Sequence, residues 1–206
     1  MDGYEADLAS LRQAARGREW TALQDTLKRL LARLEPIPAL EIPAVRIDAY
    51  LPRFEAYYPE AKWVRELFMS VAAYASAPNE LPDYAVNQFP QPGCGNFVSA
   101  VLDLARAVQT KYTVFERYSF ITNATANAIL ADLMDFYYRQ HPDEWALLTD
   151  QPDAVDEATG LPLRQVLYMR FWLDADVAQR DTATWLAVAE VLGRRLTPSG
   201  DDEPSG

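Results

Sequence analysis

A single cysteine, Cys94, and a single histidine, His141, limit the chemistry that this chain can perform. A structural zinc site needs four ligands, mostly cysteine and histidine, so zinc fingers are excluded. A Ser-His-Asp or Cys-His triad would have to use His141. That residue stands between a predicted helix and Pro142, where a cation at the C-terminal end of a helix dipole is the simpler interpretation. These residue types favour a non-catalytic protein over an enzyme.

The segment Gly93-Cys94-Gly95-Asn96 is the one locally unusual motif. Glycines beside a cysteine just before a helix leave backbone N–H groups free to bind an anion, and a helix N-terminus lowers a thiol pKa. The segment is therefore a candidate binding loop, for an anion or as a reactive thiolate. We favour the alternative, in which a tight turn leads into a helix capped by Asn96 and Cys94 fills a small space in the core.

Asp132 and Asp135 are three residues apart and share one face of a predicted helix. Such a pair can hold Mg²⁺ when another helix supplies further carboxylates, and Asp103 and Glu116 are the nearest candidates in sequence. Convergence of these four acids would indicate a metal-dependent enzyme. We favour a solvated acidic face instead. The chain lacks a dinucleotide fingerprint, a Walker loop and EF-hand spacing, so we expect neither a cofactor nor a metal.

Asn127 is unusual within a predicted helix, because asparagine is a poor helix former. Asn123, four residues earlier, is explained if the helix is interrupted near Thr122 and Asn123 caps the segment after the break. Asn127 has no such local explanation. A buried hydrogen bond and a contact with a ligand both stay open for it.

Helices must position these residues, since half of the chain is hydrophobic, only 8 residues are glycine and few segments alternate with a period of two. We predict an all-α fold, an irregular bundle of about seven to nine helices with an N-terminal helical hairpin. The expected helices are 4–16, 18–34, 44–58, 60–76, 96–112, 113–140, 142–148, 162–173 and 182–196. Long loops are expected at 77–95 and 149–160.

The N-terminal hairpin, residues 1–34, is a candidate docking arm. Its second helix has an apolar face, which includes Trp20 and Leu27 as candidate binding residues and is too large for a two-helix hairpin to bury alone. Residues 35–43 contain three prolines and are expected to form a stiff connector to a helical core domain, 44–197, and a disordered acidic tail, 198–206. The alternative is that the hairpin is simply the first layer of one bundle.

The net charge of −11 is concentrated in residues 132–206, which carry 15 acids and 6 bases. An acidic surface repels phosphate backbones and no lysine or arginine cluster is visible along the chain, so we expect no nucleic-acid partner. Mimicry of nucleic acid by this acidic third is a further hypothesis, although ordinary solubility explains the charge better. Only three of the 19 basic residues are lysines, a bias typical of a GC-rich bacterial genome.

The sequence predicts a cytoplasmic protein. One cysteine cannot form an intramolecular disulfide, the first residues lack the pattern of a signal peptide, and no apolar run is long enough to span a membrane.

We interpret the chain as a non-catalytic protein–protein interaction or regulatory module, which binds another protein or a second copy of itself. Adjacent aromatic residues such as Tyr57-Tyr58 and Tyr137-Tyr138 cannot all face inward on a helix, so some are available to a partner. The alternative is a small helical enzyme or ligand binder, using a divalent cation at Asp132 and Asp135 or an anion at the Gly93–Asn96 loop. An exposed apolar patch would favour the first interpretation.

Overall fold

The computed structural model of this chain describes residues 3–82, 88–151 and 153–197. Within these ranges the protein has nine α-helices and no β-strand, which confirms the predicted all-α class. The helices are α1 (Gly3–Gly17), α2 (Trp20–Leu31), α3 (Pro36–Tyr57), α4 (Lys62–Tyr74), α5 (Cys94–Val108), α6 (Val114–Gln140), α7 (Pro142–Asp150), α8 (Leu163–Leu173) and α9 (Ala175–Leu196). The predicted tail, 198–206, lies outside the described residues. No described helix has the length and apolar character needed to cross a membrane.

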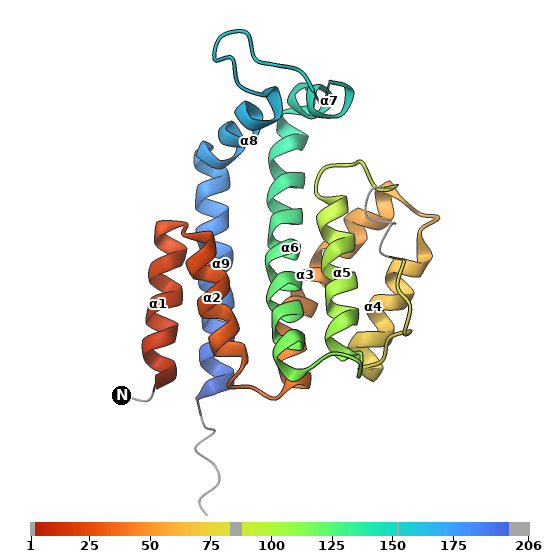
Figure 1. Cartoon of the computed structure of the whole chain (residues 1–206), viewed down its shortest axis with the longest axis vertical. Coiled ribbons are helices and arrows are strands. Elements are labelled where there is room, and N and C mark those ends of the chain that lie inside the picture. Colours follow the sequence, from red (N-terminus) through yellow and green to blue (C-terminus); the bar gives the residue numbers. More distant parts are fainter. Residues whose placement is uncertain (1–2, 83–87, 152, 198–206) are drawn as a thin grey trace, which may run out of the picture.

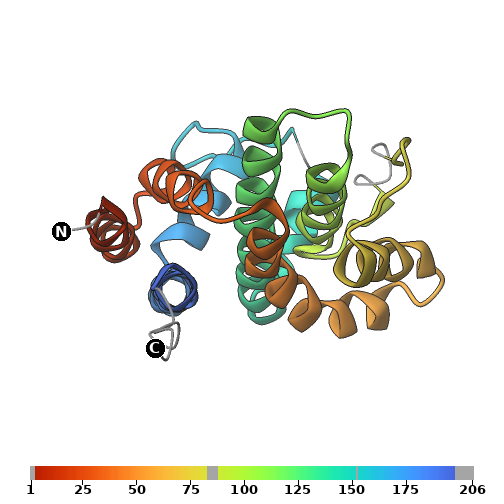
Figure 2. The same ribbon diagram turned by 90° about the horizontal axis from the view of Figure 1, so that it is seen from below.

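Helix α6 runs through the middle of the molecule, with α3, α4 and α5 on one side and α1, α2 and α9 on the other (Figure 1). The view along the helices shows the same division (Figure 2). Small buried residues of α6, among them Ala124, Ala128 and Ala131, face its neighbours. Small side chains let helix backbones approach closely, so α6 can be enclosed by α3 and α5 together.

The predicted interruption of α6 near Thr122 is wrong, since the helix is continuous from Val114 to Gln140. The hydroxyl groups of Thr122 and Thr125 donate hydrogen bonds to carbonyl oxygens one turn earlier, at 2.8 and 2.9 Å. Both threonines are buried with their hydroxyls satisfied inside the helix. Asn123 is exposed to solvent in the middle of the helix and is not a cap. The start of α6 is fixed instead by a capping box between Thr113 and Glu116.

The predicted connector at 35–43 is also wrong, because α3 begins at Pro36 and includes this segment. A proline in the first turn of a helix gives up an N–H group that has no partner within the helix, so Pro36 is well suited to begin one. Pro43 and Pro52 lie inside α3 without ending it.

Helix α9 begins at Ala175 rather than near 182, because Asp174 caps its first turn by accepting from two backbone N–H groups.

The N-terminal hairpin packs on α6 and α9. Its side chains Leu23, Leu27 and Leu30 are fully buried and belong to the same hydrophobic core as Trp185 of α9. Trp20 lies edge-on to Trp172 and Trp185, with ring centroids 5.2 and 5.7 Å apart. The face of α2 that contains Trp20 and Leu27 is therefore covered from within the chain. This packing supports the alternative in which the hairpin is the first layer of the bundle.

An ion pair between Arg18 and the buried Asp181 joins the turn between α1 and α2 to α9. Arg18 has a positive φ of 54° and donates to Asp181 of α9 over 3.4 Å and to the carbonyl oxygen of Trp172 over 2.6 Å. Asp181 is completely buried, and this burial raises its pKa above the ordinary value of 3.8 in spite of the nearby Arg18. A raised carboxyl pKa means that Asp181 contributes less to stability as pH rises above that ordinary value.

We predict that deletion of residues 1–36 will unfold or aggregate the protein. The deletion uncovers the apolar faces of α6 and α9 that α1 and α2 now bury. Circular dichroism melting and size-exclusion chromatography measure the outcome. A truncated protein that melts cooperatively as a monomer would contradict this expectation and return the hairpin to the status of a docking arm.

We predict that Arg18→Ala will lower the free energy of unfolding by about 3 kcal/mol at pH 7, because it leaves the buried Asp181 without its cation. Lowering the pH protonates Asp181 and removes the unpaired charge, so the difference from the unchanged protein should shrink as pH falls. Urea unfolding at a series of pH values measures both effects. Arg16→Ala, on the exposed last turn of α1, is the control and should change stability by less than about 0.5 kcal/mol at every pH.

Candidate functional site

The Gly93–Asn96 segment is the tight N-terminal turn of α5. Gly93 has a φ of +77°, and a Cβ atom at this position would lie 2.2 Å from the carbonyl oxygen of Ala131 on α6. Only glycine fits such a conformation and such a close approach. The helix begins at Cys94, so the cap position is occupied by Gly93 and not, as predicted, by Asn96.

Cys94 is fully buried beneath this turn. Its Sγ atom lies 3.8 Å from the hydroxyl of Tyr50, which itself donates to the carbonyl oxygen of Pro92 over 3.1 Å. Burial raises the pKa of the Cys94 thiol to about 11, and the hydrogen bond with Tyr50 opposes this effect only in part. The structure supports the interpretation of Cys94 as a packing residue.

We predict that Cys94 in the folded protein will react with iodoacetamide far more slowly than N-acetylcysteine at pH 7. With a pKa of about 11, only ~10⁻⁴ of the thiol is ionised at that pH, and the sulfur is also enclosed. Mass spectrometry of the alkylated protein follows the reaction, and the urea-unfolded chain provides the fully reactive control. A folded-state rate above that of the free thiol would establish a reactive thiolate.

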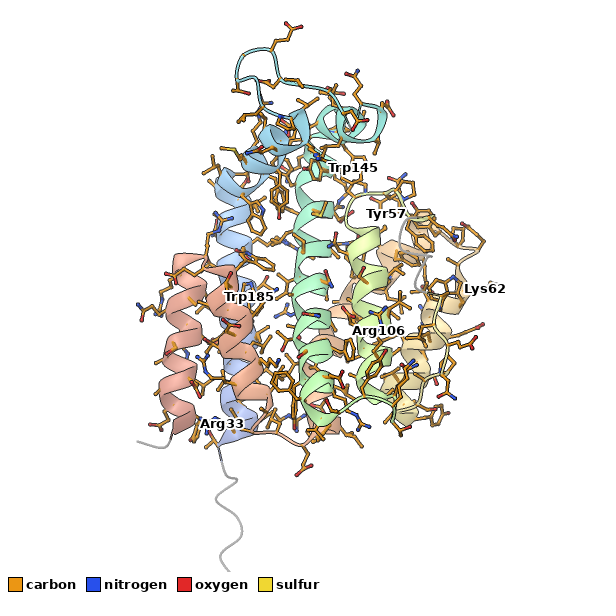
Figure 3. The ribbon with its side chains drawn as sticks, in the orientation of Figure 1. Arg33, Tyr57, Lys62, Arg106, Trp145 and Trp185 are labelled. Carbon is orange, nitrogen blue, oxygen red and sulfur yellow. The ribbon has the colours of Figure 1, made fainter. Side chains whose placement is uncertain are left out.

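A surface hollow of about 400 Å³ lies beside this turn, and its lining includes Gly93, Gly95 and Asn96 together with Met134 and Trp145. Trp145 is labelled in Figure 3 near the end of the bundle. No lysine or arginine belongs to the lining formed by the described residues. An anion at this loop would depend on the helix N-terminus alone.

Asn127 bridges α5 and α6. Its side-chain oxygen accepts from Asn96, and its amide nitrogen donates to Asp103 of α5, each over 3.4 Å. Asp103 also forms an ion pair with Arg106 at 2.5 Å. Of the two explanations left open for Asn127, these contacts support a partly buried hydrogen-bond network between helices.

Asp132 and Asp135 belong to an ion-pair network with arginines from three helices. Asp132 accepts from Arg53 of α3 at 2.8 Å and from two nitrogens of Arg180 of α9 at 2.8 and 3.1 Å. The fully buried Asp135 contacts Arg53 at 3.3 Å and Arg139 at 3.1 Å. Tyr57, labelled in Figure 3, also donates its hydroxyl hydrogen to Asp135.

This arrangement is unsuited to a divalent cation. Partial burial raises the pKa of Asp132, but the hydrogen bonds and charges of Arg180 and Arg53 outweigh it and hold the pKa below the ordinary value. Glu116 is occupied in the capping box of α6, and the described residues hold no group of three or more histidine, cysteine or acidic side chains suited to a metal. The pair therefore satisfies arginines instead of forming a solvated acidic face.

An apolar surface on α8 is a feature that the sequence analysis did not identify. Leu167 and Phe171 face inward and are buried. Val166, Met169 and Leu173 follow one another at i, i+3 and i+7 on the opposite side of the helix, and we call these three residues the α8 stripe. Met169 is 49% exposed and Leu173 is 78% exposed. One side of α8 is therefore covered by the bundle, and the other side carries apolar side chains that contact solvent.

The surroundings of α8 add to this apolar surface. Half of the large hydrophobic side chains that are exposed in the described structure belong to residues 147–173, in α7, α8 and the loop between them. They are Leu147, Val155, Leu161, Tyr168, Met169 and Leu173. These elements together form one end of the molecule (Figure 1). The sequence signal was the composition of α8, where apolar residues continue around the whole circumference.

The same end of the molecule is strongly acidic. Residues 142–176 contain eight acids and two bases, a net charge of −6, and we call these eight acids the acidic rim. One of the two bases, Arg170, is already paired with Glu144 at 3.2 Å. The loop that contains several of the acids is held by its own contacts, since Asp156 accepts from the backbone and hydroxyl of Thr159. The α8 stripe is therefore an apolar surface in a negative environment.

Comparison of the chain with protein-family models, with curated proteins and with solved structures finds no match. Any function assigned to this chain therefore rests on its own geometry. Among the predicted binding residues, Leu27 lies in the core and Trp20 is partly buried against it. Cys94 is buried as well, whereas Gly93, Gly95 and Asn96 line a surface hollow.

Proposed function

We propose that this protein is a non-catalytic interaction module, and that the α8 stripe binds a basic amphipathic helix of another protein. The observation that carries the proposal is the uncovered side of α8, where Met169 and Leu173 are exposed although Leu167 and Phe171 already anchor the helix to the bundle. Apolar surface that is exposed to water costs free energy. A partner that covers this surface removes the cost, and this gain favours binding.

The spacing of the stripe suits a helical partner. Val166 and Leu173 are seven residues apart, so the stripe extends for about 10 Å along α8 at ~1.5 Å per residue. A partner helix that crosses α8 would present two turns of its own apolar face to such a surface. Aromatic and methionine side chains beside the stripe, such as Tyr168, are typical of the centre of an interface.

The acidic rim determines the charge of the partner. A net charge of −6 over residues 142–176 attracts lysine and arginine side chains that flank an apolar face. Two copies of this chain, joined through α8, would bring the two acidic rims together and repel each other. The charge therefore favours a basic partner over a second copy. A cytoplasmic location belongs to this proposal, supported by a composition with one cysteine and so no intramolecular disulfide.

We predict that the protein will bind a synthetic amphipathic helical peptide with leucine on one face and lysine on the other, and that Met169→Ser with Leu173→Ser will weaken binding at least tenfold. Loss of two interface anchors at more than 1 kcal/mol each exceeds the ~1.4 kcal/mol that corresponds to tenfold. Fluorescence anisotropy of the labelled peptide at physiological salt measures the affinity.

Two controls separate this site from general stickiness. Ile37→Ser removes a comparably exposed apolar side chain from the first turn of α3, a helix that begins at the end of the bundle away from α8 (Figure 1), and should leave peptide binding unchanged. A peptide with glutamate in place of lysine should not bind. Equal weakening by Ile37→Ser would contradict the proposal, as would concentration-dependent dimerisation in analytical ultracentrifugation that the double α8 variant abolishes.

A further inference from the structure

Helices α3, α6 and α9 enclose a pocket that the interaction surface on α8 does not use. Its volume is about 180 Å³, and three arginines line it, which we call the arginine pocket: Arg46 and Arg53 of α3, and Arg180 of α9. The rest of the lining consists of Ala49, Tyr50, Ala128, Ile129, Asp132 and Thr184. Ala49 is exposed, so the pocket opens to solvent beside it.

Positive charge exceeds negative charge in this pocket. Among the described residues that line it, Asp132 is the single carboxylate, and it is engaged by Arg53 and by the two-nitrogen fork of Arg180. Asp135, behind it, contacts Arg53 and Arg139. The described lining thus has three arginines and one carboxylate, an excess of two positive charges in a chain whose net charge is −11.

Arg46 is the group that the network leaves unsatisfied. Within residues 3–82, 88–151 and 153–197, its guanidinium has neither a hydrogen bond nor an ion pair, although it is half-buried. Burial lowers the pKa of Arg46, Asp132 opposes this effect, and the positive charge of Arg180 adds to it. Asp132 compensates this partly desolvated guanidinium only in part, because its carboxylate already accepts hydrogen bonds from Arg53 and Arg180.

We propose that the arginine pocket binds a phosphate group. Arginine donates from several nitrogens in a fixed plane and is the preferred residue for phosphate recognition. Arg46 offers its whole guanidinium, while Arg53 and Arg180 keep donors that Asp132 does not use. The hydroxyl of Thr184 completes a set of donors from two helices.

The size of the pocket limits the ligand. A volume of about 180 Å³ corresponds to about six waters at ~30 Å³ each. That space admits a phosphate group but is smaller than the ~300–1,000 Å³ typical of pockets for drug-sized ligands. A nucleic-acid backbone does not fit into it. The ligand is therefore free inorganic phosphate or the phosphate end of a small phosphate ester.

Titration calorimetry and thermal melting with inorganic phosphate test this proposal, against potassium chloride at equal ionic strength. We expect saturable binding with a rise in melting temperature, because a ligand of the native state stabilises it. Arg46→Gln should reduce the affinity at least tenfold. Without phosphate this variant should melt at the same or a higher temperature, since it loses no hydrogen bond or ion pair within the described structure and removes a charge that burial and Arg180 disfavour. Arg164→Gln, an exposed arginine of α8 outside the pocket, should bind phosphate as the unchanged protein does.

A second variant tests the charge balance from the opposite side. Asp132→Asn removes the competing carboxylate and should increase the affinity for phosphate, even though it frees Arg53 and Arg180 and lowers the melting temperature.

Glycerol 3-phosphate distinguishes the two sources of the ligand. Tighter binding of the ester than of phosphate identifies a small phosphate ester, and equal or weaker binding identifies free phosphate.

Several outcomes would overturn the proposal. Phosphate could stabilise the protein no more than chloride does, or Arg46→Gln could bind phosphate unchanged. A fall in the melting temperature of Arg46→Gln without phosphate, together with no phosphate binding in the unchanged protein, would assign Arg46 a purely structural role. None of these results concerns α8. The proposed interaction surface is tested independently, by the peptide-binding experiment.

Discussion

Burial of α6 along nearly its whole length is the constraint on which the rest of this structure depends. A helix in the middle of a bundle is surrounded by other helices, so its side chains must be small or apolar, or must have their polar groups hydrogen-bonded. Alanines such as Ala124 and Ala128 meet the closely packed helices, and threonine hydroxyls bond within the helix itself. Two further polar side chains of α6 are satisfied from outside the helix, Asn127 by α5 and Asp132 by α3 and α9. These polar contacts join α3, α5 and α9 to α6.

The two proposed sites arise from this architecture in opposite ways. The arginine pocket exists because α3 and α9 bring arginines to the carboxylates of α6, and the arginines that line the pocket outnumber its carboxylate. The α8 surface exists because α7 and α8 lie beyond the end of the bundle, where α6 and α9 can cover only one side of each. The arginine pocket results from an excess of positive charge inside the bundle. The α8 surface results from apolar side chains that no other described helix covers.

The sequence predicted the helices well where hydrophobic periodicity was strong, and less well where one residue type has two structural uses. Proline ends a helix but also begins one, so the stretch at 36–43 was assigned to a connector although it is the first part of α3. Threonine and asparagine cap helices but are tolerated inside them, which is why α6 was expected to break at Thr122. Asp132 and Asp135 were recognised as a pair. Their partners Arg53 and Arg180 are separated by more than a hundred residues, and no local pattern shows that such residues meet.

The close association of α1 with α9 has a consequence for the synthesis of the protein. The two helices run antiparallel, with Arg18 near Asp181 and Leu8 near Gly193, so α1 contacts a helix that is synthesised much later. At ~5–20 residues per second, roughly ten to thirty seconds separate the synthesis of α1 from that of α9. During that time α1 can pack on α2 but not on α9, and the pairing of α1 with α9 joins distant parts of the chain, which slows folding. Until α9 has been made, the side of α1 that α9 covers in the folded protein therefore stays exposed to solvent.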